Sequence, residues 1–450
     1  MAPAGADPGS AHGRGGSVTG TADADAAGAA QDYRRQLAYL LQYSDFYRAR
    51  LEAAGIRRAQ DAGGLEEIAL LPLTGKDELR ATRSAANPIG THLACAEAEI
   101  ARIYSTSGTT GTPSFIPLTR NDLANWVTIS ARSYAASGLT EGERVVTSYN
   151  AGPFVAGAAL AAFDTIGACH VPVGTGNTER LLTAIRMLAP DAVVVTPSYA
   201  AHLAERAAAS GMDLPASSVR RVLVAGEPGG GEPAMRARLE QAWGARVTEA
   251  MGIGDIAVSL WGECPEGAGM HFGGAGLVHV ELIDPQTGAA RAFEDGAEGE
   301  LVYTHLRHEA APLLRFRSRD HVRVGTGRCG CGRVTPRVRC IGRTDDMLIL
   351  RGVNVFPSAL REVVSEFAPR VSGMILVTPD APGVQQTPPL PVSVELARDA
   401  TAADGLAEAI EARIREALVV RTRIELVAHG SLPRSEYKSK LVQRPAGEGG

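Results

Sequence analysis

The chain carries a run of hydroxyl side chains and glycines whose chemistry suits a phosphate group. The run reads Tyr104-Ser-Thr-Ser-Gly-Thr-Thr-Gly-Thr-Pro-Ser114 and follows the short apolar stretch 100–104. Glycines let the backbone turn so that several N–H groups converge on one anion, and the hydroxyl groups add donors. The lysine that a Walker A motif requires is missing. Composition alone leaves a polar surface loop as the alternative.

Three cysteines and one histidine form a second group that could do chemistry. Cys264 precedes His271 by a short segment, and Cys329 and Cys331 form a CxC pair. Three thiolates and one imidazole are a complete tetrahedral zinc set, and a set supplied entirely by the protein is typical of a structural site. The alternative is that these are reduced cysteines packed in the core.

The length and composition indicate a globular protein with more than one domain. A chain of 450 residues is too long for one compact core. Hydrophobic content of 45% and charged content of 21% are ordinary, and a net charge of -5 offers no basic surface for nucleic acid or an anionic membrane. The sequence shows neither a membrane-span pattern nor a signal-peptide pattern, so we expect a cytoplasmic location.

The apolar pattern predicts two folded regions after a disordered start. Residues 1–30 carry almost no large apolar side chain, so we expect them to be disordered. From 31 to 342, apolar runs such as 192–195 alternate with helical stretches, which predicts an α/β domain with mixed sheets. Residues 343–445 are predicted to form a small α+β domain. Its expected strands are 347–350, 374–377, 392–396 and 423–427, and its expected helices are 358–367 and 406–419.

Several motifs together resemble one enzyme superfamily. The loop 107–113, Ser-Gly-Thr-Thr-Gly-Thr-Pro, is similar to the phosphate loop of adenylate-forming enzymes, the superfamily of acyl-CoA synthetases and luciferases. Seven further segments resemble the phenylacetate–CoA ligase branch, and they occur in that branch's order over residues 31–445. They are Gly176–Arg180, Thr196–Tyr199, Gly226–Pro228, Arg315–Asp320, Gly342–Asp346, Arg351–Pro357 and Leu432–Glu436.

The resemblance implies a large adenylate-forming domain with mixed sheets flanked by helices, and a small mobile α+β lid. It also implies an AMP-forming ligase that activates a small, aromatic carboxylic acid with ATP and Mg²⁺ and then transfers it to CoA. The implied ATP-binding residues are Ser107, Gly108, Thr109, Thr110, Gly111, Gly226, Glu227, Pro228, Asp320 and Arg343. Lys438, with Lys440 as the fallback, is the implied catalytic lysine, and Asp255 is the implied catalytic ligand of magnesium.

The resemblance also assigns residues to the later steps. Asp345 corresponds to the hinge about which the lid turns, and Gly352 and Asn354 border the implied CoA tunnel. The acyl pocket is expected from segments 149–154, 174–177 and 226–228. Some members of the branch carry similar Cys…His and Cys-x-Cys pairs, which favours the structural zinc set described above.

The chain departs from the family pattern at two places near the phosphates. Where the family has Tyr-Gly-x-Ser/Thr-Glu, this chain has Met251-Gly-Ile-Gly-Asp255, and the aspartate reaches about one methylene less far toward Mg²⁺. The family also places a lysine beside the loop proline, whereas Thr112 and Ser114 flank it here. We still predict that the chain binds a nucleotide. The changed residues are ones that the family uses to activate a carboxylate, so this step is the one that the departures would affect.

Two further interpretations remain open from the sequence. The departures suit an ATP-dependent diazotase of an actinobacterial biosynthetic pathway for secondary metabolites, which activates nitrite to diazotise an arylamine. They also suit a nucleotide-binding protein that has lost catalysis. Relatives often pair, so a homodimer is a further expectation.

Overall fold

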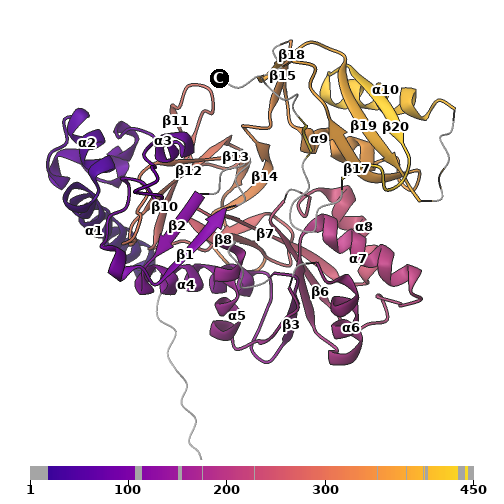
Figure 1. Ribbon diagram of the computed structural model, residues 1–450, viewed down its shortest axis with the longest axis horizontal. Helices are drawn as coiled ribbons and strands as arrows, with labels where there is room; N and C mark the ends of the chain where they lie inside the picture. Colours follow the sequence, from indigo (N-terminus) through magenta and orange to yellow (C-terminus); the bar gives the residue numbers. More distant parts are fainter. Residues whose placement is uncertain are drawn as a thin grey trace, which may run out of the picture.

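The structure is a computed structural model (Figure 1), and it describes residues 19–106, 114–149, 155–174, 176–227, 229–351, 353–381, 383–398, 400, 404–433 and 441–443. Several residues with predicted roles lie outside this described part. They are Ser107, Gly108, Thr109, Thr110, Gly111, Pro228, Gly352, Lys438 and Lys440.

Helices α1 (Thr19–Tyr43) and α2 (Asp45–Ala53) begin the described chain and form one end of the molecule in Figure 1. Residues 19–30, which composition placed in a disordered tail, are therefore helical. This stretch is rich in alanine, the strongest helix former. The same helix continues into a part whose side chains Tyr33 and Leu37 are buried in the core. The elements that follow are η1 (Ala59–Ala62), η2 (Leu65–Leu70), α3 (Lys76–Ala81) and η3 (Glu97–Glu99).

A short hairpin holds the predicted phosphate loop. Strands β1 (Arg102–Thr106) and β2 (Ser114–Leu118) pair antiparallel, with Thr106 opposite Ser114. The two described ends of loop 107–113 are thus fixed by the hairpin.

One mixed sheet forms the centre of the large domain. In space its strands follow the order β11-β10-β12-β13-β14-β9-β8-β7-β6-β5-β3-β4, and β3 to β7 run parallel while β7 to β14 are joined antiparallel. All four residues of β5 are buried, as expected of a parallel strand covered on both faces. The strands are β3 (Arg144–Thr147), β4 (Cys169–Pro172), β5 (Ala192–Val195), β6 (Arg221–Ala225), β7 (Arg246–Ile253), β8 (Ala257–Glu263), β9 (Met270–Phe272), β10 (Val278–Ile283), β11 (Ala290–Arg291), β12 (Glu298–His305), β13 (Phe316–Gly325) and β14 (Arg337–Arg343).

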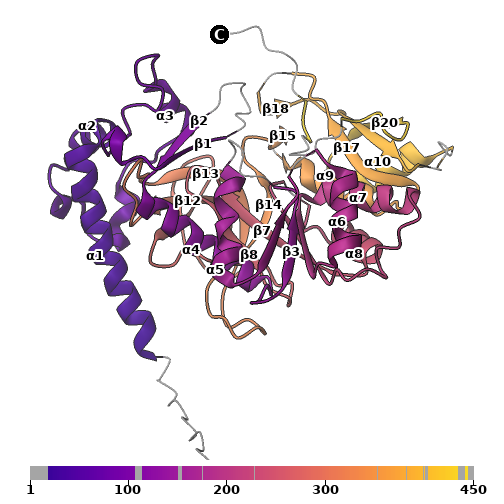
Figure 2. The ribbon, with the colours of Figure 1, turned by 60° about the horizontal axis from the view of Figure 1, so that its bottom comes forward.

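Helices cover this sheet, and Figure 2 shows α4 and α5 lying in front of its strands. Helix α4 packs on β8, and α7 packs on β6. The helical elements are α4 (Arg120–Ala136), η4 (Val155–Ala159), α5 (Ala161–Ile166), α6 (Thr178–Leu188), α7 (Pro197–Ala209) and α8 (Pro233–Trp243). No helix in the described residues is both long enough and apolar enough to cross a membrane.

The C-terminal part forms two small sheets and two helices around a core of its own, which includes Leu360, Val392 and Ile410. Its elements are β15 (Leu348–Leu350), β16 (Val353–Val355), α9 (Pro357–Ser365), β17 (Val371–Val377), β18 (Gln385–Gln386), β19 (Leu390–Leu396), α10 (Leu406–Leu418) and β20 (Thr422–Val427). The predicted fold class, a large α/β domain with a small α+β domain, is confirmed. The exact boundary between residues 342 and 343 stays a prediction.

Candidate active site

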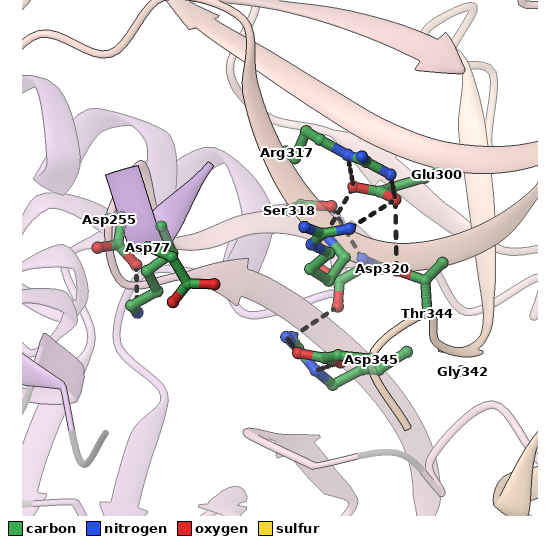
Figure 3. Close-up of polar contacts among 12 residues, drawn as sticks. Asp77, Asp255, Glu300, Arg317, Ser318, Asp320, Gly342, Thr344 and Asp345 are labelled. Carbon is green, nitrogen blue, oxygen red and sulfur yellow. Dashed lines mark hydrogen bonds and ion pairs between the residues drawn. The ribbon is translucent and has the colours of Figure 1, made fainter. Parts of the chain in front are cut away.

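The two residues predicted to contact the ribose lie together on neighbouring strands. Asp320 of β13 is directly opposite Arg343 at the end of β14. The Arg343 guanidinium contacts Asp320 Oδ1 at 3.3 Å and donates to both carboxylate oxygens of Asp345, at 2.9 and 2.7 Å. Arg343 therefore links the implied ribose site to the implied hinge, and Figure 3 shows Asp320 and Asp345 lying near each other.

A buried glutamate holds this arrangement in place. Glu300 is fully buried and accepts two hydrogen bonds from Arg317, at 3.0 and 2.7 Å. It also accepts from the backbone N–H of Arg319 and from the hydroxyl of Thr344, each at 3.3 Å. Glu300 thus fixes the residues that flank Asp320 and Arg343. Arg319 has a φ of 68°, so its backbone is strained immediately before Asp320.

Asp255 lies on the turn between β7 and β8 and is paired with a lysine that the sequence did not single out. The Lys76 ammonium contacts Asp255 Oδ2 at 2.9 Å, although 179 positions separate the two residues. In Figure 3, Asp77 and Asp255 lie on one side, while Asp320 and Asp345 lie on the other.

Two described residues of the predicted acyl pocket, Tyr149 and Gly226, lie close together. The hydroxyl of Tyr149 donates to the carbonyl of Ala225 at 3.0 Å, beside Gly226. Gly226 has a φ of 95°, a conformation that favours glycine. Glu227 accepts a hydrogen bond from the backbone N–H of Ser198 at 2.7 Å, at the start of α7. Glu227 therefore stabilises the start of helix α7, and the resemblance also places it near adenine.

The two domains touch through the hinge and through helix α9. A Cβ on Gly342 would lie 2.7 Å from the Phe356 ring, so only glycine permits this approach. Arg361 of α9 forms a nearly buried double ion pair with Glu232, with distances of 3.0 and 2.6 Å. Asn354, an implied CoA-tunnel residue, lies on β16 and is exposed.

The four predicted metal ligands converge as one cluster. Their ligand atoms all lie within 4.8 Å of one another. The Sγ atoms of Cys264 and Cys329 are 3.6 Å apart, and Cys331 Sγ is 3.5 Å from His271 Nε2. Tetrahedral zinc with bonds of about 2.3 Å places its sulfur ligands roughly 3.8 Å apart, so this spacing fits. The other ring nitrogen of His271 contacts the Thr335 hydroxyl at 3.0 Å, and this contact holds the ring in the orientation that points Nε2 at the cysteines.

The sequence motifs singled out Asp320, Arg343 and the cysteine cluster, and the structure brings the members of each set together. They did not single out Lys76, Glu300 or Arg361, which contact Asp255, the flanks of Asp320 and Glu232. Lys76 stands in the short run Gly75-Lys76-Asp77, which carries no recognisable spacing. Glu300 and Arg361 resemble ordinary surface charges in the sequence, and only their burial at 0% and 5% shows otherwise.

Family models match both domains of the chain. One described as "AMP-binding enzyme" matches residues 43–305, and one described as "AMP-binding enzyme C-terminal domain" matches residues 352–444. The chain is 33% identical to phenylacetate-coenzyme A ligase from Pseudomonas putida, over 87% of this chain and 88% of that relative. It is 32% identical to phenylacetate-coenzyme A ligase from Escherichia coli (strain K12), over 94% of this chain and 95% of that relative.

Solved structures of one ligase share the fold. The chain matches 2-hydroxyisobutyryl-CoA ligase in its postadenylation state with a TM-score of 0.85 and 25% identity, covering 95% of this chain and 90% of that one. It matches the same ligase in its thioesterification state with a TM-score of 0.68 and 26% identity, covering 94% and 90%.

This chain belongs to the AMP-binding enzyme family, within the adenylate-forming superfamily. It falls in the phenylacetate–CoA ligase-like branch and is an ATP-dependent AMP-forming ligase. The cytoplasmic location, the homodimer and the lack of a nucleic-acid or membrane partner stay predictions.

Proposed function

We propose that this protein activates a small aromatic carboxylic acid with ATP and then transfers the acyl group to CoA. The observation that carries the proposal is the joined set of Asp320, Arg343 and Asp345. It stands in a chain 33% identical to a phenylacetate–CoA ligase over 87% of its length.

In the first half-reaction, a carboxylate oxygen of the acid attacks the α-phosphorus of ATP, and the bond to pyrophosphate breaks. Asp320 accepts hydrogen bonds from the ribose hydroxyls, and Arg343 keeps its carboxylate in place. Lys438 bridges the acid and the α-phosphate. Asp255 would hold Mg²⁺, which neutralises charge on the phosphates when it is bound.

An ATP–pyrophosphate exchange assay over a panel of aryl and short aliphatic acids tests this proposal. We expect exchange that depends on an aryl acid, followed by thioester formation when CoA is added. If none of the acids in the panel supports exchange, the proposed substrate class is wrong.

Replacing Asp320 with asparagine is expected to raise the KM for ATP about 30-fold, because the ribose hydroxyls lose a charged acceptor. Melting temperature should change little, since the amide keeps the shape of the carboxylate. Asp164→Asn, on the exposed face of α5, is the matched control. An unchanged KM in Asp320→Asn would show that the ribose binds elsewhere.

The second half-reaction requires the small domain to turn about Asp345. The chain resembles the postadenylation form of the neighbour more than its thioesterification form, with TM-scores of 0.85 and 0.68, which supports such a turn here. After the turn, Gly352 and Asn354 would border CoA, whose thiol attacks the acyl carbon and releases AMP.

Arg361→Met is expected to lower the exchange rate about tenfold, because a buried ion pair that loses one partner leaves the other charge uncompensated. Glu232 would then favour the turned domain, where water can reach it. Thioester formation from supplied acyl-adenylate and CoA should be preserved. Arg413→Met, which removes an exposed pair with Glu366 inside the small domain, is the control. Equal losses in both half-reactions would instead indicate general destabilisation.

We further propose that Cys264, His271, Cys329 and Cys331 hold a structural zinc ion. The fit of their spacing to a tetrahedron supports this assignment. All four positions of zinc are filled by protein atoms, so the site stabilises the fold and leaves no place for a reacting water.

The comparisons give no support to the diazotase interpretation, since the relatives named above are CoA ligases. The connected Asp320–Arg343–Asp345 set also argues against a protein that has lost catalysis.

A further inference from the structure

The adenine segment, residues 226–232, contains the three residues that the resemblance places against adenine. Contacts within the large domain hold parts of it. Glu227 accepts a hydrogen bond from the backbone N–H of Ser198 at 2.7 Å. Arg236 of α8 donates twice to the carbonyl of Gly230, at 3.0 and 2.8 Å. The beginning and the middle of the segment are therefore tied to the large domain itself.

The end of the adenine segment is held from the small domain. Arg361 of α9 donates to both carboxylate oxygens of Glu232, at 3.0 and 2.6 Å, and the two side chains are only 5% and 12% exposed. A Cβ on Gly229 would lie 3.3 Å from Arg361 Nη2, so the guanidinium packs against the backbone of the segment. Although burial lowers the pKa of this guanidinium, the charges of Glu232, Glu227 and Glu249 raise it overall. The small domain thus places a buried cation among carboxylates of the large domain.

The same helix also contacts the strand that carries the implied ribose residue. Helix α9 lies against β14 and α8 (Figure 1). The Ser358 hydroxyl donates to the carbonyl of Ile341 at 2.5 Å, and the Phe356 ring lies against Gly342, next to Arg343. Helix α9 therefore touches the large domain at two places, beside the implied adenine residues and beside the implied ribose residue.

We propose that Arg361 is a positioning residue that makes nucleotide affinity depend on the orientation of the small domain. The inference rests on the proposed AMP-forming reaction. While Arg361 contacts Glu232, the adenine segment is held in place and the nucleotide binds tightly. When the small domain turns, Arg361 leaves, the end of the segment loosens, and AMP is released. Because such coupling is reciprocal, a bound nucleotide favours the orientation in which Arg361 contacts Glu232.

Binding of AMP tests this coupling without any acid substrate. By calorimetry, Arg361→Met is expected to raise the Kd of AMP about tenfold, within the range of ordinary coupling between two sites. Glu232→Gln should cause a similar rise, because it weakens the same contact from the other side. Arg398→Met is the matched control, since Arg398 is an exposed arginine of the small domain that contacts Glu205 of α7 at 4.0 Å. It should leave the Kd within about twofold.

The double variant Arg361→Met/Glu232→Gln separates positioning from a loss of stability. Arg361→Met alone leaves a buried carboxylate that has lost its guanidinium, so its melting temperature should fall. The double variant carries neither charge and should regain much of that temperature. It should nevertheless bind AMP as weakly as either single variant, because all three lack the same contact. If AMP affinity recovers together with the melting temperature, the affinity merely follows stability and the proposal is overturned.

The failure of this inference can be told apart from the failure of the proposed function. A Kd of AMP in Arg361→Met within about twofold of the parent value would overturn the inference, and acid-dependent exchange by the same parent protein would leave the proposed function standing. If no acid supports exchange but Arg361→Met and Glu232→Gln still lose AMP affinity, the coupling stands and the proposed substrate class is wrong.

Discussion

Lys438→Ala is expected to lower acid-dependent ATP–pyrophosphate exchange about 10³-fold. A cation that bridges the acid and the α-phosphate acts where negative charge accumulates in the transition state, and removing one such group costs about 10²–10³ in rate. Thioester formation from supplied acyl-adenylate and CoA should remain near the parent rate, because that step no longer contains the phosphate attack. Comparing the two half-reactions is the measurement.

Lys440→Ala is the control for this experiment, since it removes a neighbouring lysine of the same tail. It should change exchange by less than about threefold if Lys438 is the bridging residue. If Lys440→Ala loses most of the pyrophosphate exchange activity and Lys438→Ala keeps it, then Lys440 is the bridging lysine. Unchanged exchange in the double variant would contradict catalysis by a C-terminal lysine.

Local patterns in the sequence were sufficient for much of the fold. The apolar run 192–195 coincides with β5, because a parallel strand covered on both faces needs no polar position. The expected helix 406–419 coincides with α10, whose buried residues Leu406, Ile410 and Ile414 follow helical spacing. For both elements, the pattern of apolar residues that predicts the secondary structure lies within one short stretch of the sequence.

Long-range contacts could not be predicted in this way. Lys76 and Asp255 meet only because Thr74 pairs with the start of β13 and because β7 and β8 form a hairpin. Arg361 meets Glu232 only through the placement of one domain on the other. The local sequence does not distinguish a charged residue that becomes buried from one that stays exposed. Motif resemblance located Asp320 and Arg343 where physical patterns alone did not.

Removing a ligand of the proposed zinc site is expected to have the largest effect on stability. The cluster joins the end of β8, strand β9 and the connection from β13 to β14, and these last two strands carry Asp320 and Arg343. Binding of structural zinc contributes about 10–16 kcal/mol to the stability of small zinc domains. Even half of that free energy would exceed the loss of stability that most point mutations cause. We expect Cys331→Ser to lower the melting temperature by roughly 10 °C and to raise the KM for ATP.

Metal analysis should find about one zinc ion per parent chain and much less in Cys331→Ser. A strong chelator should lower the parent melting temperature toward that of the variant, and added zinc should reverse the change. Cys169→Ser removes an exposed cysteine outside the cluster and is expected to behave as the parent. Parent protein that is free of zinc and insensitive to the chelator would contradict the assignment. Because β13 and β14 run from the cluster to the ribose residues, loss of the metal should weaken ATP binding before the whole domain unfolds.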